Sequence, residues 1–99
     1  DLAGSPSIQH VTQIPEEVRQ LFVTAHDVSP EHHVRMQAVF QRYSDSGVSK
    51  TINLPAMATK AHVAEAFLLA YRLECKGLTV FRSGSREQQV FSCSPTQPC

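Results

Sequence analysis

A change of hydrophobic period in the middle of the chain limits the folds that are open to it. Residues 48–54 (VSKTINL) alternate between apolar and polar side chains, which predicts a β-strand that ends at Pro55. Thr59 is a suitable N-cap for an apolar pattern of helical spacing, and residues 78–81 (LTVF) form a second β-rich run. A strand, a helix of roughly 15 residues and another strand predict a βαβ unit with parallel strands and a right-handed crossover.

Two helices are predicted before this unit. Pro15, followed by two glutamates, suits the first turn of a helix that His26 and Asp27 end. Ser29 is a suitable N-cap for a second helix, which the turn at residues 45–47 (DSG) ends. Helical spacing predicts the side chains that face the core: Val18, Leu21, Phe22 and Ala25 in the first helix, and Met36, Val39, Phe40 and Tyr43 in the second.

The helix after Thr59 is the most apolar of the three. Its spacing predicts burial on more than one side, because leucines widen its main stripe. The main stripe consists of Val63, Ala66, Phe67, Ala70 and Tyr71, and the additional side chains are Leu68, Leu69 and Leu73.

The predicted order, α-α-β-α-β, leaves one face of the sheet without cover. Parallel strands need both faces covered, and two strands with three helices do not achieve this. The polar side of the first strand would therefore meet water, a ligand or the rest of a barrel, so the chain is predicted to belong to a larger structure. That polar side consists of Ser49, Thr51 and Asn53, and the opposite side of Val48, Lys50, Ile52 and Leu54.

Charge and length exclude several classes of function. Nine basic and nine acidic residues give a formal net charge of zero, so no field gathers nucleic acid or anionic lipid. The longest apolar run, Ala66–Tyr71, is far shorter than the roughly 20 residues that span a bilayer. A length of 99 residues predicts one domain. No signal-peptide pattern is present, and the absence of an initiator methionine favours a piece of a longer polypeptide.

Histidines and a cysteine are the first candidates for chemistry. His32 and His33 are adjacent on a predicted helix and point about 100° apart, and no cysteine or carboxylate near them and His26 completes a ligand spacing. We therefore predict no metal site. Cys75 lies near a helix C-terminus, where the dipole opposes a thiolate, and is predicted to be a small buried side chain in a reduced compartment.

Three further sets of residues each have two interpretations, one functional and one structural. Thr51 and Asn53 would line a lumen and contact substrate if their strand belongs to a barrel, or would pack inward. The loop at residues 82–86 (RSGSR) suits a phosphate, or is a solvated turn. Cys93 and Cys99, in a Ser/Pro/Gln-rich tail, form a dithiol pair or are incidental thiols. The residues by themselves thus indicate a soluble α/β chain without a self-sufficient active site.

Several short segments, in one unbroken order, resemble the C-terminal part of the catalytic subunit of adenosylcobalamin-dependent (class II) ribonucleotide reductases. The resemblance covers residues 14–90 and implies a fragment of a ten-stranded α/β barrel, with residues 1–13 as a lead-in loop and 91–99 as a flexible tail. The segments are 14–17 (IPEE), 24–27 (TAHD), 35–38 (RMQA), 48–55 (VSKTINLP), 69–71 (LAY) and 75–86 (CKGLTVFRSGSR).

The resemblance also implies an activity. Such enzymes replace the 2′-hydroxyl of a ribonucleoside di- or triphosphate with hydrogen through a thiyl radical, for DNA synthesis in the cytoplasm. Their reducing cysteines are renewed by a thioredoxin-type dithiol. The radical cysteine and the phosphate-binding loop lie upstream in the family, so no catalytic residue is assigned to this chain. By itself it is expected to be inactive and to bind no cobalamin.

Two pairs of residues depart from related patterns. Thr79 and Val80 occupy the place of the tandem tyrosines that relay a radical in the diiron-dependent relatives, which favours the cobalamin class. Cys93 and Cys99 match the place of a cysteine-rich redox tail but lack its CxxC spacing. Two other functions stay open: an independent interaction or regulatory module, and a stand-alone nucleotide-binding domain that uses Thr51, Asn53 and Arg82.

Overall fold

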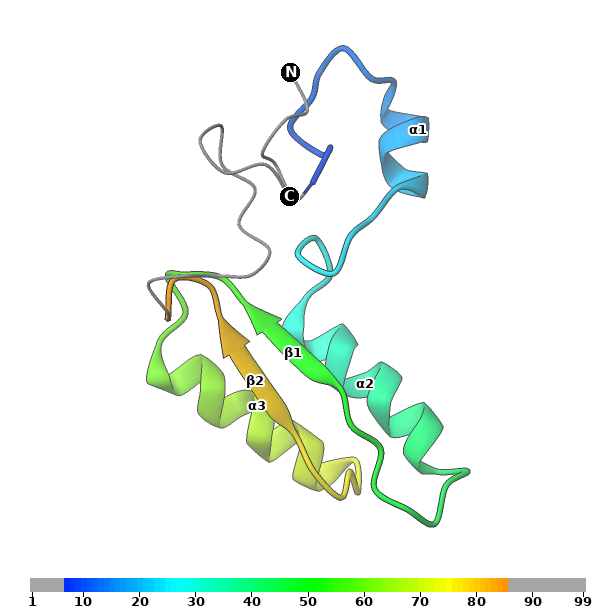
Figure 1. Ribbon diagram of the computed structural model, residues 1–99, viewed down its shortest axis with the longest axis vertical. Coiled ribbons are helices and arrows are strands. Elements are labelled where there is room, and N and C mark those ends of the chain that lie inside the picture. Colours follow the sequence, from blue (N-terminus) through cyan, green and yellow to red (C-terminus); the bar gives the residue numbers. More distant parts are fainter. Residues whose placement is uncertain (1–6, 86–99) are drawn as a thin grey trace. The chain divides into compact units, whose positions relative to one another are not determined.

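The computed structural model describes residues 7–85 of the chain, and these residues form two compact units, 7–28 and Ser29–Ser85. The first unit contains the short helix α1 (Glu16–Leu21). The second contains α2 (Pro30–Gln41), β1 (Thr51–Leu54), α3 (Lys60–Arg72) and β2 (Thr79–Arg82) (Figure 1). The predicted order α-α-β-α-β is confirmed.

The two strands of the second unit pair in parallel. Their register runs from Thr51 opposite Thr79 to Leu54 opposite Arg82, with α3 as the crossover between them. This confirms the predicted βαβ unit and the end of the first strand before Pro55. The first strand is shorter than the predicted range of 48–54, because the peptide groups of Val48 bond to side chains of α2 and not to β2.

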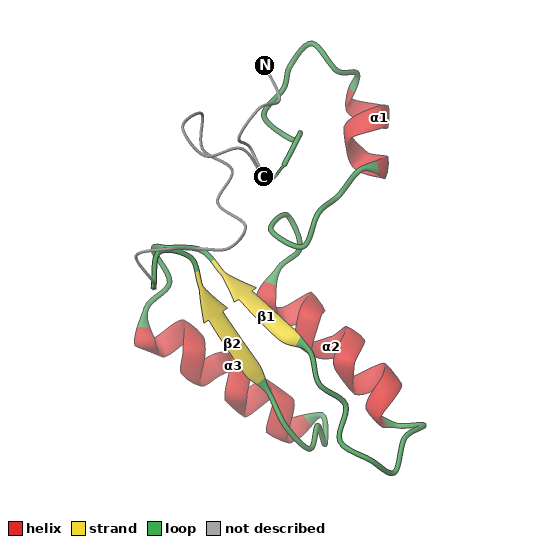
Figure 2. Cartoon of the chain, viewed as in Figure 1, coloured by secondary structure: helices red, strands yellow, loops and turns green. Residues whose placement is uncertain are grey.

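Both long helices lie on one face of the sheet, which makes a two-layer unit (Figure 2). Val34 of α2, Ile52 of β1 and two alanines of α3 form the buried cluster. Small alanine side chains let α3 approach the sheet closely. The partly buried side chains around this cluster are Leu69, Leu73, Cys75, Leu78 and Val80.

The other face of the sheet is polar and open to solvent in the structure. Thr51 and Thr79 are exposed, and Asn53 and Phe81 are partly exposed. No helix of the Ser29–Ser85 unit covers this face, which agrees with the expectation that the polar side of the first strand looks away from the core.

The predicted core stripe of α2 was wrong. Its members are all exposed, from 43% for Met36 to 84% for Tyr43. The buried face of the helix instead carries His33, Val34, Gln37 and Gln41. The glutamines are tolerated there because each donates hydrogen bonds to backbone carbonyls of the segments before the strands.

The other two helices also bury less than predicted. The first helix ends at Leu21, short of Ala25, and has no buried residue. In α3 only Ala66 and Ala70 are buried, so the expectation of burial on more than one side was wrong. Its exposed large side chains are Phe67, Leu68 and Tyr71. Among residues 7–85, no helix has the length and apolar character that crossing a membrane requires.

The predicted helix starts are confirmed. The Ser29 side chain accepts a hydrogen bond from the backbone N–H of His32. Thr59 caps α3 in the same way, accepting from the N–H of His62, whose Nδ1 accepts from the N–H of Thr59 in return. This reciprocal pair satisfies two backbone donors that a helix N-terminus otherwise leaves open.

Candidate functional site

The uncovered side of the sheet is the best candidate for a functional surface. We call it the open face and define it by Thr51, Asn53, Thr79 and Phe81. Side chains alternate along a strand, and the register places Thr51 opposite Thr79 and Asn53 opposite Phe81. The open face thus offers two hydroxyls, a carboxamide and an aromatic ring side by side. Such a set can hydrogen-bond a polar ligand and cover one apolar surface of it, and it holds no group that titrates near neutral pH.

The loop after β2 is a tight turn tied to the end of β1. The Ser83 N–H donates to the Leu54 carbonyl at 2.9 Å, and Gly84 adopts a φ of 74°. The guanidinium Nη1 of Arg82 donates to the Ala56 carbonyl at 2.7 Å. Arg82 therefore links the loops that follow the two strands. The second arginine of the predicted phosphate loop, Arg86, lies outside the described residues, and a phosphate site there stays a prediction.

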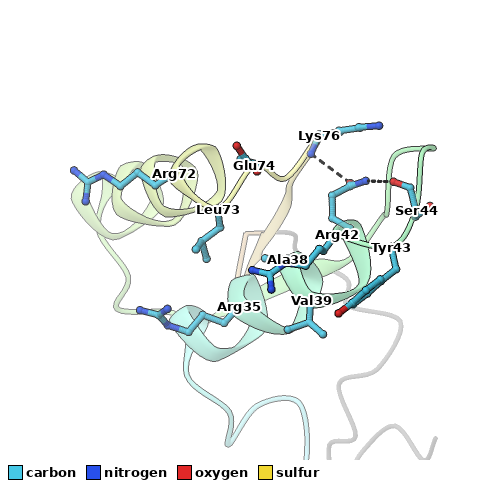
Figure 3. Close-up of a pocket in the computed structure, with 11 residues that line it drawn as sticks. Arg35, Ala38, Val39, Arg42, Tyr43, Ser44, Arg72, Leu73, Glu74 and Lys76 are labelled. Atoms are coloured by element: carbon cyan, nitrogen blue, oxygen red, sulfur yellow. Dashed lines mark hydrogen bonds between the residues drawn. The ribbon is translucent and has the colours of Figure 1, made fainter.

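The opposite end of the sheet carries a basic pocket that sequence analysis missed. A cavity of about 710 Å³ lies between the C-terminal ends of α2 and α3 (Figure 3). Zero net charge over the whole chain hides this local excess of positive charge. Arg42 and Arg72 lie at the C-terminal ends of α2 and α3, where the helix dipole stabilises a cation without a ligand. The basic side chains that line the cavity are Arg35, Arg42, Arg72 and Lys76.

Two of these cations are already engaged. Arg35 pairs with Glu31 at 2.7 Å, and Lys76 donates through Nζ to the carbonyl of Asp45. The pocket therefore has a structural role at this end of the unit, and we assign it no ligand.

We identify no site in residues 7–85 where histidine or cysteine side chains would bind a metal or act as a nucleophile. No three side chains of His, Cys, Asp or Glu gather there as metal ligands. His33 is buried on α2, whereas His26 and His32 are exposed. Cys75 packs against the core, and burial raises the pKa of its thiol. Cys75 is partly buried, whereas full burial was predicted, and its raised pKa does not favour an activated nucleophile. Cys93 and Cys99 lie outside the described residues.

A carboxylate closes the turn after α1. Asp27 accepts hydrogen bonds from the Ser7 hydroxyl and from both the N–H and the hydroxyl of Thr24. Desolvation opposes its ionisation, but these hydrogen bonds outweigh it, so the pKa of Asp27 lies below its ordinary value. Asp27 is thereby a structural group that keeps its charge at neutral pH.

Comparison with known proteins identifies the family. A model of the ribonucleotide reductase barrel domain matches residues 1–81. The chain belongs to this family. A vitamin B12-dependent ribonucleoside-diphosphate reductase of Thermoplasma acidophilum is 51% identical to this chain over 96 residues, or 97% of the chain and 12% of that protein. The protein of the same description from Mycobacterium tuberculosis is 42% identical over 98 residues, or 99% of the chain and 14% of that protein.

One of the more distant relatives matches a shorter part of the chain. A vitamin B12-dependent ribonucleotide reductase of Agrobacterium fabrum is 36% identical over 67 residues, or 68% of the chain and 5% of that protein. The chain therefore spans only a small part of the length of the relatives it matches. These findings confirm the resemblance to cobalamin-dependent reductases. The family description confirms a barrel domain, and the structure shows two of its parallel strands without closure.

Sequence reasoning missed two buried polar residues with many hydrogen bonds in residues 7–85. Gln37 and Gln41 are buried on α2 and bond to the segments that precede both strands. The signal was present, since two glutamines four residues apart occupy the same helix face. It was overlooked because the apolar stripe on the other side of the helix was assigned to the core.

Proposed function

We propose that this chain supplies two neighbouring strands to the catalytic barrel of a vitamin B12-dependent ribonucleoside-diphosphate reductase. The observation that carries the proposal is the parallel β1–β2 pair, with helices on one face and polar side chains on the other. In a barrel, the helix-covered side of each strand faces outward and the other side faces the lumen. The names of the Thermoplasma and Mycobacterium relatives support the diphosphate substrate. We propose that this barrel has ten strands.

The proposed reaction removes one oxygen from the ribose. The C2′–OH bond breaks, a C2′–H bond forms, and the oxygen leaves as water. Two electrons and two protons come from a pair of cysteine thiols, which become a disulfide and are reduced again by a thioredoxin-type dithiol. Adenosylcobalamin, held by the complete enzyme, would supply the radical chemistry that starts this reaction. We propose that the complete enzyme acts in the cytoplasm and provides deoxyribonucleotides for DNA synthesis.

The chain itself contributes binding surface in this proposal. The Thr51 hydroxyl and the Asn53 carboxamide would hydrogen-bond the nucleotide, and the Phe81 ring would pack beside it. Residues 7–85 gather no metal-ligand cluster. We expect the chain alone to be inactive and to bind no cobalamin, because the radical cysteine of the family lies upstream. Cys93 and Cys99 are proposed as part of the redox tail.

Kinetics of the complete reductase test the role of the open face. Thr51→Val and Asn53→Leu each remove hydrogen-bonding groups at nearly constant volume, and each should raise KM for the diphosphate about five- to tenfold. Thr12→Val is the matched control, because Thr12 is exposed in the first unit. Equal KM values for all three variants and the parent enzyme would show that the open face does not bind the substrate.

The two other functions are separated by one titration. Adding nucleoside diphosphates to the 99-residue chain alone, followed by backbone amide shifts, asks whether it binds nucleotide without the rest of a barrel. Shifts at the ends of β1 and β2 would favour a stand-alone nucleotide-binding domain. An interaction module predicts no such shifts and requires a protein partner.

A further inference from the structure

Two buried glutamines of α2 hold the segments that lead into the strands. Gln37 is only 1% exposed, and its Nε2 donates to the carbonyl of Val48 at 3.0 Å and to that of Gly77 at 2.6 Å. Val48 lies shortly before β1 and Gly77 shortly before β2. One carboxamide thus bridges two segments that are far apart in sequence.

Gln41 binds the same two segments through its side-chain oxygen, which accepts hydrogen bonds from backbone N–H groups. Its Oε1 accepts from the N–H of Val48 at 3.1 Å and from the N–H of Lys76 at 3.4 Å. Its Nε2 donates to the carbonyls of Ser44 and Ser46. Val48 is therefore held at both its N–H and its carbonyl, and the segment before β2 is held at the Lys76 N–H and the Gly77 carbonyl.

Only one orientation of the Gln37 side-chain amide is compatible with its hydrogen-bond partners. Its Oε1 is buried and has no hydrogen-bond partner among the described residues. Rotating the amide would place that oxygen against two carbonyl oxygens, which repel it. The nitrogen with its two donors must therefore face the strands, and the buried oxygen is the cost of that arrangement.

A parallel strand pair needs such a device. No hairpin turn sets the register of parallel strands, because a crossover element lies between them. The ladder here is short, from Thr51 opposite Thr79 to Leu54 opposite Arg82. A slip of one residue would turn every side chain of a strand to the other face. The backbone groups held by the glutamines are fixed points of register just before the ladder begins.

We infer that Gln37 and Gln41 are positioning residues, which set the register of β1 against β2 and thereby place Thr51 and Asn53 on the open face. The second half of this inference rests on the proposed function. Neither glutamine touches substrate, so their effect on the reaction passes through the strands.

The test uses the complete reductase with three variants. Gln37→Met keeps the length of the side chain and removes both donors. Gln37→Glu keeps its shape, but the carboxylate cannot donate to the two carbonyls. Gln20→Met is the control, because Gln20 is exposed on α1 and bonds only within its own helix, to Glu16.

Hydrogen–deuterium exchange is the first measurement. In Gln37→Met, the amides of β1 and β2 should exchange at least about tenfold faster, while those of the capped start of α3, near Thr59, keep their rates. A uniform increase that includes α3 would show a general loss of stability, and unchanged strand amides would show no role in register. Either result overturns the inference.

The pH dependence of Gln37→Glu is the second measurement. A buried carboxylate facing carbonyl oxygens favours its neutral form, so its pKa is raised. The protonated acid donates one hydrogen bond, so the ratio of the strand exchange rates in Gln37→Glu to those in the parent, both measured at the same pH, should fall toward one as pH falls through that pKa. This recovery is expected even if Gln37→Met does not fold, and a ratio that stays constant across the pH range contradicts the inference.

Kinetics separate this inference from the proposed function. We expect KM for the nucleotide to rise in Gln37→Met with kcat less affected, as for Thr51→Val. If Thr51→Val raises KM but Gln37→Met does not, the inference fails and the proposed function stands. If strand exchange changes in Gln37→Met but neither variant alters KM, the proposed function fails, and with it the link from the glutamines to substrate.

Discussion

Val34 and Val39 lie on opposite sides of α2, and replacing each by alanine tests which side faces the sheet. Val34 is 0% exposed within the core cluster, whereas Val39 is 58% exposed. Both positions are inside the same helix and the chemical change is the same. The gain in helix propensity from valine to alanine, up to about 0.7 kcal/mol, therefore cancels in the difference between the two variants.

The expected difference follows from burial. Val34→Ala removes two buried carbon groups at about 0.8 kcal/mol each, and any cavity that does not collapse adds about 24 cal/mol per Å³. Val39→Ala removes carbon from a largely exposed position and should cost almost nothing. We expect the free energy of unfolding of Val34→Ala to lie about 2 kcal/mol below that of Val39→Ala.

Urea unfolding of the 99-residue chain, followed by far-ultraviolet circular dichroism, measures this difference. Thiol labelling gives an independent readout, because a cysteine placed by Val39→Cys should react rapidly and one placed by Val34→Cys slowly. Equal destabilisation by the two alanine variants, or greater destabilisation by Val39→Ala, would mean that the apolar stripe faces the core as the sequence suggested. The burial described for α2 would then be refuted.

Three further predictions concern local interactions. Burial raises the pKa of Cys75, so its alkylation at pH 8 should be slower in the folded chain than in urea, and equal rates would contradict this. Thr24→Val should raise the pKa of Asp27 in a carbon-detected NMR titration. Since that pKa is lowered on folding, its stabilising effect is present near neutral pH and lost as pH falls through the folded value, and an unchanged pKa would exclude the Thr24 hydroxyl as one of its causes. Thr59→Ala should lower the free energy of unfolding by about 1 kcal/mol, with Thr59→Ser as the conservative control, and equal stability of the two would exclude a capping role.

The candidate site was only partly predictable from sequence. Thr51 and Asn53 could be placed on one side of a strand because side chains alternate with a period of two. Their neighbours Thr79 and Phe81 needed the register, which depends on hydrogen bonds between segments distant in sequence. The roles of the buried glutamines could not be predicted either, because their partners are backbone groups of loops.

The amino-acid sequence by itself determined the order of elements, the helix caps at Ser29 and Thr59, and the parallel βαβ unit. These depend on local spacing, on capping side chains and on the handedness of the chain, all of which act over a few residues. The tertiary structure decided which side of α2 faces the core. An apolar stripe and a glutamine pair compete for that position. The glutamines occupy it because the segments before two parallel strands present backbone groups that only a buried carboxamide satisfies.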